Sequence, residues 1–550
     1  MKRCPTCHET VVDERLRFCR RDGAMLVADS SSLASESRET LLKLSPPESG
    51  SAPAPVRSSP LMLGETPTTS ALLTTSLARK RRVTRSKHID SIAVLPLVND
   101  SSEQQMEYLS DGITESIINN LAQLPRLRVV PRSTVFRYKG GGADPQEVGY
   151  ALGTRAVLTG RVLQVDDLLI VRVELIDVAL ESQLWGEEYR RGTGDIFAIQ
   201  EEISREISAK RRLRLSGEER QRLARRYTDN TEAYHFYLRG RYYTNRRTTD
   251  WINKGIEQFQ QAIERDPKYA LAHTGLADAY ALLASSTGER APIEWYPKAR
   301  ASALKALEFD EGLAEAHTSL GFCRLLYDWD FAQAGREFKR AIELNPASAN
   351  AHDGHSFYLK AMGQHEKAIR ACLRAQRVEP LSLFANVSLG WAYYFARQYD
   401  RAIEQHLKAL EMDPQFTFAY WNLGMARAQQ GRMDEAVQAF QQAHSISGGG
   451  LTFKAHLGYA CALAGQRDEA ERIMNELEEL GQQRYVSSYY PAIIYLGLGG
   501  INEALTCLES AYEERSGFMA FMKVEPMLDP LRSDRRFALL ERRIRPLSLG

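Results

Sequence analysis

The chain has 550 residues, with 71 basic and 70 acidic side chains and a formal net charge of +1. Its length predicts several domains, and the charge balance excludes attraction of nucleic acid or membranes by the chain as a whole. No run approaches the roughly 18 apolar residues of a membrane span, and the first residues lack the apolar core of a secretory signal. The seven cysteines suit a reducing compartment. Together these features predict a soluble, cytoplasmic protein.

Residues 1–29 contain two short motifs typical of zinc knuckles, in which a tight turn directs two side chains at one metal ion. The segment resembles the short zinc ribbons of bacterial N-termini, except that an aspartate stands at the position of the fourth cysteine. His8 is a second candidate for that fourth position, and the alternative is a degenerate ribbon that no longer binds metal. The resemblance implies one zinc ion with the ligands Cys4, Cys7, Cys19 and Asp22.

Residues 30–87 are rich in Ser, Pro, Thr and Ala and have no hydrophobic periodicity, which predicts a disordered linker. The linker ends in a basic run that begins at Arg79 and ends at Lys87. Such a run can bind phosphate groups on nucleic acid or anionic lipid. More often it is simply the solvated end of a linker.

Residues 88–210 have the pattern of a small α/β sandwich. Apolar runs at 92–98 and 127–131 have strand length, and residues 111–124 have helical periodicity. Alternation in the later part of the region predicts a hairpin that turns at Asp166 and Asp167. The remaining predicted elements are strands at 156–163, 168–178 and 183–190 and helices at 146–152 and 196–210.

Four stretches of this region resemble the TolB amino-terminal-like domain, also described as FlgO-like. They are residues 92–97, 108–115, 157–162 and 184–189. In bacteria that domain commonly precedes tetratricopeptide repeats, and many relatives carry a kinase, a cyclase or a winged-helix DNA-binding domain before it, often with a membrane span between. Here a ribbon-like segment takes the effector position without a span, so membrane signalling does not follow from the resemblance.

Several isolated polar residues are candidate reactive groups, and each has a simpler interpretation. Asp111 and Glu115 lie one helical turn apart, but we expect Asp111 to cap the helix and Glu115 to be solvated. Lys139 precedes three glycines without the spacing of a phosphate-binding loop. His352 and His355 share a helical face without an evident third metal ligand, so we expect structural roles. The sequence therefore predicts no enzyme.

After a predicted linker helix at 211–230, residues 231–548 are dominated by a period of 34 residues. A larger residue follows each repeated alanine by four positions, as expected for a packed helical face. The pattern resembles tetratricopeptide (TPR) repeats and, with two looser units at its start, predicts an α-helical solenoid of about eight repeats. The residues in phase are Ala334, Ala368, Ala402, Ala436, Ala470 and Ala504, with Pro346, Pro380 and Pro414.

In TPR arrays the first helix of each repeat lines a concave surface, and the resemblance implies which positions face inward. Several aromatic residues on such a wall suit an extended or helical segment of a protein partner, although some could instead pack between repeats. The sequence thus predicts a non-enzymatic scaffold in bacterial signalling or regulation. The alternative is a nucleic-acid-associated regulator that acts through the ribbon and the basic linker. The predicted groove residues are Phe357, Phe384, Trp391, Tyr394, Phe395, Phe418 and Trp421.

Overall fold

The chain divides into two compact units, Met1–Cys19 with Ala24–Ile89, and Arg20–Gly23 with Asp90–Gly550. In the first unit, β1 (Lys2–Arg3) pairs antiparallel with both β2 (Thr10–Val11) and β3 (Val27–Ala28). The predicted zinc ligands Cys4, Cys7, Cys19 and Asp22 and the whole predicted linker at 30–87 lie outside the described residues. The computed structural model describes residues 2–3, 10–11, 27–28, 89–101, 106–122, 124, 127–140, 142, 144–210, 227–285, 290–346, 348–378 and 382–544.

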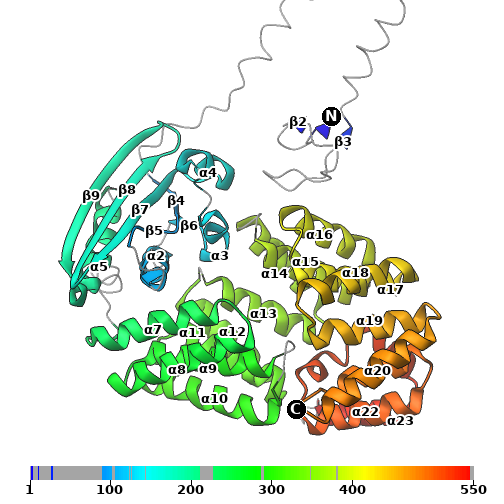
Figure 1. Cartoon of the computed structure of the whole chain (residues 1–550). Coiled ribbons are helices and arrows are strands. Elements are labelled where there is room, and N and C mark those ends of the chain that lie inside the picture. Colours follow the sequence, from blue (N-terminus) through cyan, green and yellow to red (C-terminus); the bar gives the residue numbers. More distant parts are fainter. Residues whose placement is uncertain are drawn as a thin grey trace, which may run out of the picture. The chain divides into compact units, whose positions relative to one another are not determined.

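The second unit begins with a six-stranded mixed sheet in the order β6-β4-β7-β8-β9, with β5 (Val98–Asn99) also paired to β7 (Figure 1). β4 (Ser91–Val94) runs parallel to β6 (Arg128–Val129) and β7 (Ala156–Val165). β8 (Leu168–Asp177) and β9 (Ser182–Gly192) then continue the sheet antiparallel. β4 is buried along its whole length, as expected for a central strand with both faces covered. The predicted hairpin turns at Asp166, whose φ is 52°.

Helices pack against this sheet through regularly spaced apolar residues. α2 (Glu107–Ala122) buries Ile113 and Ile117 completely, and α5 (Ile196–Lys210) does the same with Ile199 and Ile203. A small mixed sheet with helices is therefore confirmed in this region. The additional elements are α4 (Pro145–Leu152), the short α3 (Arg132–Val135) and the 3-10 turns η4 (Phe136–Tyr138) and η5 (Thr193–Asp195).

Sixteen helices within the described residues then form eight successive pairs, which confirms the predicted solenoid of repeats. The pairs are α7 (Thr231–Thr244) with α8 (Thr249–Arg265), α9 (Ala270–Ala284) with α10 (Pro292–Phe309), α11 (Ala314–Cys323) with α12 (Phe331–Leu344), α13 (Ala349–Ala361) with α14 (His365–Val378), α15 (Leu383–Phe395) with α16 (Tyr399–Met412), α17 (Thr417–Gln429) with α18 (Met433–Ile446), α19 (Leu451–Leu463) with α20 (Arg467–Gly481), and α21 (Tyr489–Gly497) with α22 (Ile501–Glu513).

Three shorter elements follow α22, and one interrupts the third pair. The π-helical turn η6 (Arg324–Asp328) extends α11. The 3-10 segments η7 (Gly517–Phe521) and η8 (Pro526–Leu531) lead to the last helix, α23 (Arg535–Ile544). No helix in the described ranges is long and apolar enough to cross a membrane.

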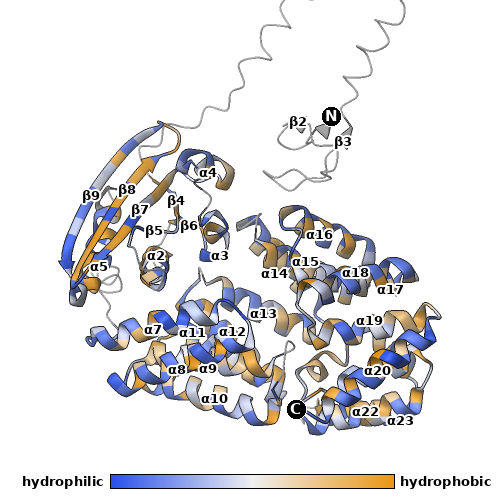
Figure 2. Ribbon diagram, viewed as in Figure 1, coloured by the Kyte–Doolittle hydropathy of each residue, from blue (hydrophilic) through white to orange (hydrophobic). Residues whose placement is uncertain are grey.

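The repeat is held together by small residues where helices approach closely. All six phased alanines are fully buried. Gly354 on α13 faces Phe338 on α12, and an added Cβ would lie 2.3 Å from that ring, so only glycine fits. Pro346 and Pro414 follow the ends of α12 and α16 by two residues, as a helix stop predicts. In Figure 2, hydrophobic and hydrophilic residues are interspersed along the helices of the array, as expected for helices with one buried side.

Candidate partner-binding groove

The first helices of successive repeats line one large cavity of about 2050 Å³, which we call the groove. Because each repeat presents the same helix to the inside, side chains from distant parts of the sequence meet there. α7, α9, α11, α13, α15 and α17 all contribute, and residues of α2 in the α/β domain extend the lining.

The α/β domain contacts the array through α2, α5 and α7. The Tyr234 hydroxyl on α7 lies 2.7 Å from the Ser116 hydroxyl on α2 and accepts a hydrogen bond of 2.8 Å from Gln200 Nε2 on α5. The Arg239 guanidinium lies 4.7 Å from the centre of the Tyr108 ring. These contacts place the groove-lining residues of α2 beside the first repeat.

Asp111 and Glu115 differ from the sequence expectation. α2 begins at Glu107, so Asp111 lies inside the helix, and its carboxylate pairs with Lys139 Nζ at 2.5 Å. Glu115 is largely buried between Arg132, at 3.1 Å, and Arg241. Burial opposes its ionisation, but the two arginines prevail and lower the pKa of Glu115. The cap and the solvated side chain were therefore wrong predictions.

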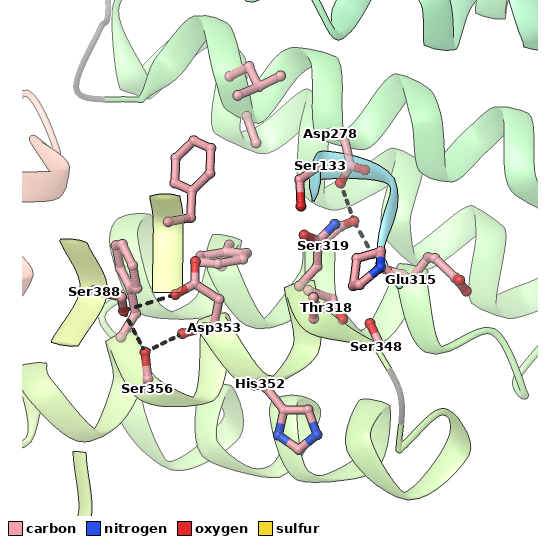
Figure 3. A pocket seen from close by; sticks show the side chains of 18 of the residues that line it. Ser133, Asp278, Glu315, Thr318, Ser319, Ser348, His352, Asp353, Ser356 and Ser388 are labelled. Carbon is pink, nitrogen blue, oxygen red and sulfur yellow. Dashed lines mark hydrogen bonds between the residues drawn. The ribbon is translucent and has the colours of Figure 1, made fainter. Parts of the chain in front are cut away.

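A polar section of the groove lies on α9, α11 and α13 (Figure 3). Asp278 Oδ1 accepts a 2.5 Å hydrogen bond from Ser319 Oγ, and Asp353 Oδ1 accepts one of 3.1 Å from Ser388 Oγ. Burial raises the pKa of Asp278, Asp353 and Glu315, although nearby cationic side chains oppose the shift at all three, and serine hydroxyls oppose it at the two aspartates. The section offers carboxylate and hydroxyl groups to a bound segment. His352, beside it, contacts the Pro346 carbonyl at 2.9 Å.

Lys360 is fully buried between α13 and α15, and sequence reasoning missed it. Its Nζ donates to Ser388 Oγ at 2.8 Å and lies 4.4 Å and 4.8 Å from the ring centres of Phe357 and Trp391. Burial lowers the pKa of this ammonium group. The signal that could have found it is its phase, because Lys360 stands 34 residues before Tyr394, a residue assigned to the groove.

The predicted aromatic residues fall into two patches. Phe384 is 42% exposed and lies 6.2 Å, centre to centre, from the partly buried Phe418, and both contact Phe416. We call Phe384, Phe416 and Phe418 the open patch. Trp421 is only 7% exposed and packs its ring against Phe418, Phe453 and His456.

The second patch is partly covered by the chain itself. Residues 517–531, here the return segment, carry Phe521, whose ring stacks on Phe395 at 5.6 Å with 3° between the planes. The same ring lies 5.1 Å from Trp391 and 6.3 Å from Phe357. Tyr394 and Phe395 retain only 1% and 2% exposure. We call Phe357, Trp391 and Phe395 the closed patch.

Polar contacts hold the return segment in place. The buried Glu525 carboxylate accepts hydrogen bonds from the Tyr394 hydroxyl and, at 3.1 Å, from the Met527 amide. Burial raises the pKa of Glu525 to about 7. At the edge of the contact, Arg397 pairs with Asp529 at 2.6 Å. Tyr394 and Phe395 are thus part of the core, whereas the partly buried Phe357 and Trp391 still line the groove, as does the open patch.

Comparison with known proteins establishes the class of the helical array. Residues 387–450 and 427–488 match family models of the tetratricopeptide repeat. Together with the eight helix pairs, these matches identify the array as TPR repeats. Residues 86–206 match the model of the second domain of HilA/YgeH-like transcriptional regulators. The resemblance of this region to the TolB amino-terminal-like domain stays a prediction.

Individual relatives are more distant. A protein of Rhizobium meliloti (strain 1021) named putative adenylate cyclase 3 is 35% identical over 187 residues, which are 34% of this chain. The match spans 32% of that relative's length. The crystal structure of YrrB, a TPR protein with an unusual peptide-binding site, is 21% identical, with a TM-score of 0.25, over 36% of this chain and 96% of its own. PilF of Pseudomonas aeruginosa is 18% identical, with a TM-score of 0.30, over 40% and 93%.

Proposed function

We propose that this chain is a non-enzymatic, cytoplasmic scaffold that holds a segment of a protein partner in its groove. The observation that carries the proposal is the open patch, where a phenylalanine exposed by 42% borders a cavity of about 2050 Å³. TPR arrays generally mediate protein–protein interaction, and a large exposed ring beside a concave wall is typical of an anchor site.

The partner segment would lie along the first helices. Its apolar side chains would pack on Phe384 and Phe418, with Trp421 supporting them from beneath. Its backbone N–H groups and polar side chains would meet Asp278 and Asp353, whose carboxylates retain acceptor capacity beyond their serine partners. Tyr394 and Phe395 would contribute to the stability of the array instead of to binding, because they are buried beneath the return segment, whereas the partly buried Trp391 lines the groove beside it.

A photo-crosslinking experiment tests the proposal. A benzophenone amino acid replaces Phe384 in the full chain, and the matched control carries it at Leu304 on α10, which is 46% exposed and does not line the groove. In nuclease-treated lysate of the source organism, we expect a discrete protein adduct from position 384 alone. It should survive high salt and disappear with Phe418→Ala. The same adducts from both positions would contradict the proposal.

A second candidate function is a nucleic-acid-associated regulator. The match of residues 86–206 to a domain of HilA/YgeH-like transcriptional regulators favours it. The ribbon with Cys4, Cys7, Cys19 and Asp22 and the basic run at 79–87 would supply the contacts, and zinc binding there stays a prediction. Phosphate contacts weaken steeply as salt rises, so an adduct that needs low salt and disappears after nuclease treatment would favour this candidate.

A further inference from the structure

β9 lies at the edge of the six-stranded sheet, where the described part of the chain places no further strand beside it. The strand has 11 residues, and most of them are exposed. Figure 1 shows β9 on the outer side of the sheet, and Figure 2 shows that it is largely hydrophilic where β8 is hydrophobic. A long exposed edge presents unpaired backbone N–H and C=O groups, which can pair with another strand.

The charges along this edge reverse sign about a single residue. Glu187 and Glu188 precede Tyr189, and Arg190 and Arg191 follow it. Because strand side chains alternate between faces, Glu188 and Arg190 share one face and Glu187 and Arg191 share the other. The contacts agree, since Glu188 pairs with Arg190 at 2.5 Å and with Arg172 of β8, while Arg191 lies 3.4 Å from Glu202 of α5.

Between residues 187 and 191, the charges restrict the registers in which β9 can pair antiparallel with its own copy. A two-fold axis perpendicular to the sheet keeps the same face of both copies on the same side. One residue of β9 then lies directly opposite the same residue of the second copy, and that residue defines the register. An axis at Glu187, Glu188, Arg190 or Arg191 sets that charge directly opposite itself, which is unfavourable. An axis at Tyr189 sets each Glu188 opposite Arg190 and each Glu187 opposite Arg191.

We propose that β9 is a homodimer interface, in which two copies of this chain join their sheets antiparallel in the register centred on Tyr189. Residues 186–192 of each copy then pair, with opposite charges matched on both faces. On the outer face the existing contact between Arg172 and Glu188 continues into Arg190 of the second copy. Charges that only protect a sheet edge from pairing do not need to be arranged symmetrically about one residue. The charges of β9 disfavour the registers centred on the residues next to Tyr189 and favour the register centred on Tyr189 itself.

A charge-exchange experiment on the full chain tests this interface by analytical ultracentrifugation. Variant one carries Glu187→Arg with Glu188→Arg, variant two carries Arg190→Glu with Arg191→Glu, and variant three carries all four changes. We expect a wild-type dimer, and a dissociation constant raised by at least about tenfold in variants one and two. An equimolar mixture of variants one and two should form heterodimers, and variant three should recover the homodimer.

The matched control is Glu147→Arg on α4, an exposed charge change away from β9, which should leave the dimer intact. Recovery in the mixture separates a contact between copies from a loss of folding, because mixing cannot restore contacts with Arg172 or Glu202 within one chain. The proposal is overturned by a wild-type chain that stays monomeric at about 0.1 mM, by a dimer that variants one and two leave unchanged, or by a mixture that fails to associate.

Discussion

The open and closed patches share the helix α15 and have similar residues, yet the structure uses them differently. Phe384 of the open patch and Phe395 of the closed patch lie at opposite ends of one helix, α15. Phe384 faces the groove with 42% of its surface exposed, whereas Phe395 is stacked beneath Phe521 and retains 2%. The position of a residue within a repeat therefore predicts which face of the helix carries it. Whether that residue is exposed depends on a segment distant in the sequence, here the return segment.

The two patches should also respond differently to mutation. The closed patch joins the middle repeats to the return segment, so its side chains contribute to the free energy of unfolding. Phe384 of the open patch contributes little to the free energy of unfolding, because much of its side chain remains in contact with water in the folded state. Changes in the closed patch should lower stability, and changes in the open patch should weaken partner binding at nearly constant stability.

The largest expected effect comes from Phe521→Ala. Removing a fully packed ring leaves a cavity among Phe357, Trp391 and Phe395, and large-to-small changes of this kind cost about 3–5 kcal/mol. Urea denaturation of the purified chain, followed by circular dichroism, measures the change in the free energy of unfolding. A loss below about 1 kcal/mol would show that the return segment is not tightly packed.

A smaller, pH-dependent effect is expected from Glu525. Its pKa is raised to about 7 from the model-peptide value of 4.5 by burial, so the folded state favours the protonated form. The stabilisation is complete below pH 4.5 and is lost as the pH rises through 7, by about 3 kcal/mol in total. Glu525→Gln stays neutral and should remove this dependence.

Unfolding free energies of wild type and Glu525→Gln at pH 5, 6, 7 and 8 provide the measurement. Tyr394, Tyr459, Arg397 and Asp529 surround the carboxyl group and are common to both proteins, so their contributions largely cancel in the difference. We expect wild type to lose stability relative to the variant as the pH rises. Parallel curves would contradict a buried carboxyl group that titrates near neutrality.

The smallest effect on stability is expected from Phe384→Ala. An exposed side chain away from the core usually changes the free energy of unfolding by no more than about 0.5 kcal/mol. The same change should weaken capture of the partner that crosslinks from this position, measured as co-purification with the full chain. Strong destabilisation of the variant, or undiminished capture of the partner, would contradict the expectation that Phe384 contributes to partner binding and not to stability.

Several features of the fold could be predicted because they depend on local contacts. The phased alanines identified the helix pairs, since a helix that packs closely on its partner needs a small residue at each contact. Along β8 the burial alternates as a half-buried strand requires, whereas β7 begins with three successive buried residues. By contrast, the prediction that Asp111 caps a helix was wrong. The helix α2 begins earlier, at Glu107, and Lys139 from a later turn pairs with the Asp111 carboxylate.

By itself, the sequence determined the repeat, the strand pattern and the helix faces, because 34-residue and two-residue periods follow from packing between neighbours. Only the tertiary structure decided which aromatic residues are covered and where Lys360 and Glu525 are buried. Those outcomes depend on contacts between residues far apart in the chain, such as Phe521 with Trp391 and Glu525 with Tyr394. A local sequence pattern cannot predict such contacts, since each residue fits its own helix or turn whether or not the distant residue is in contact with it.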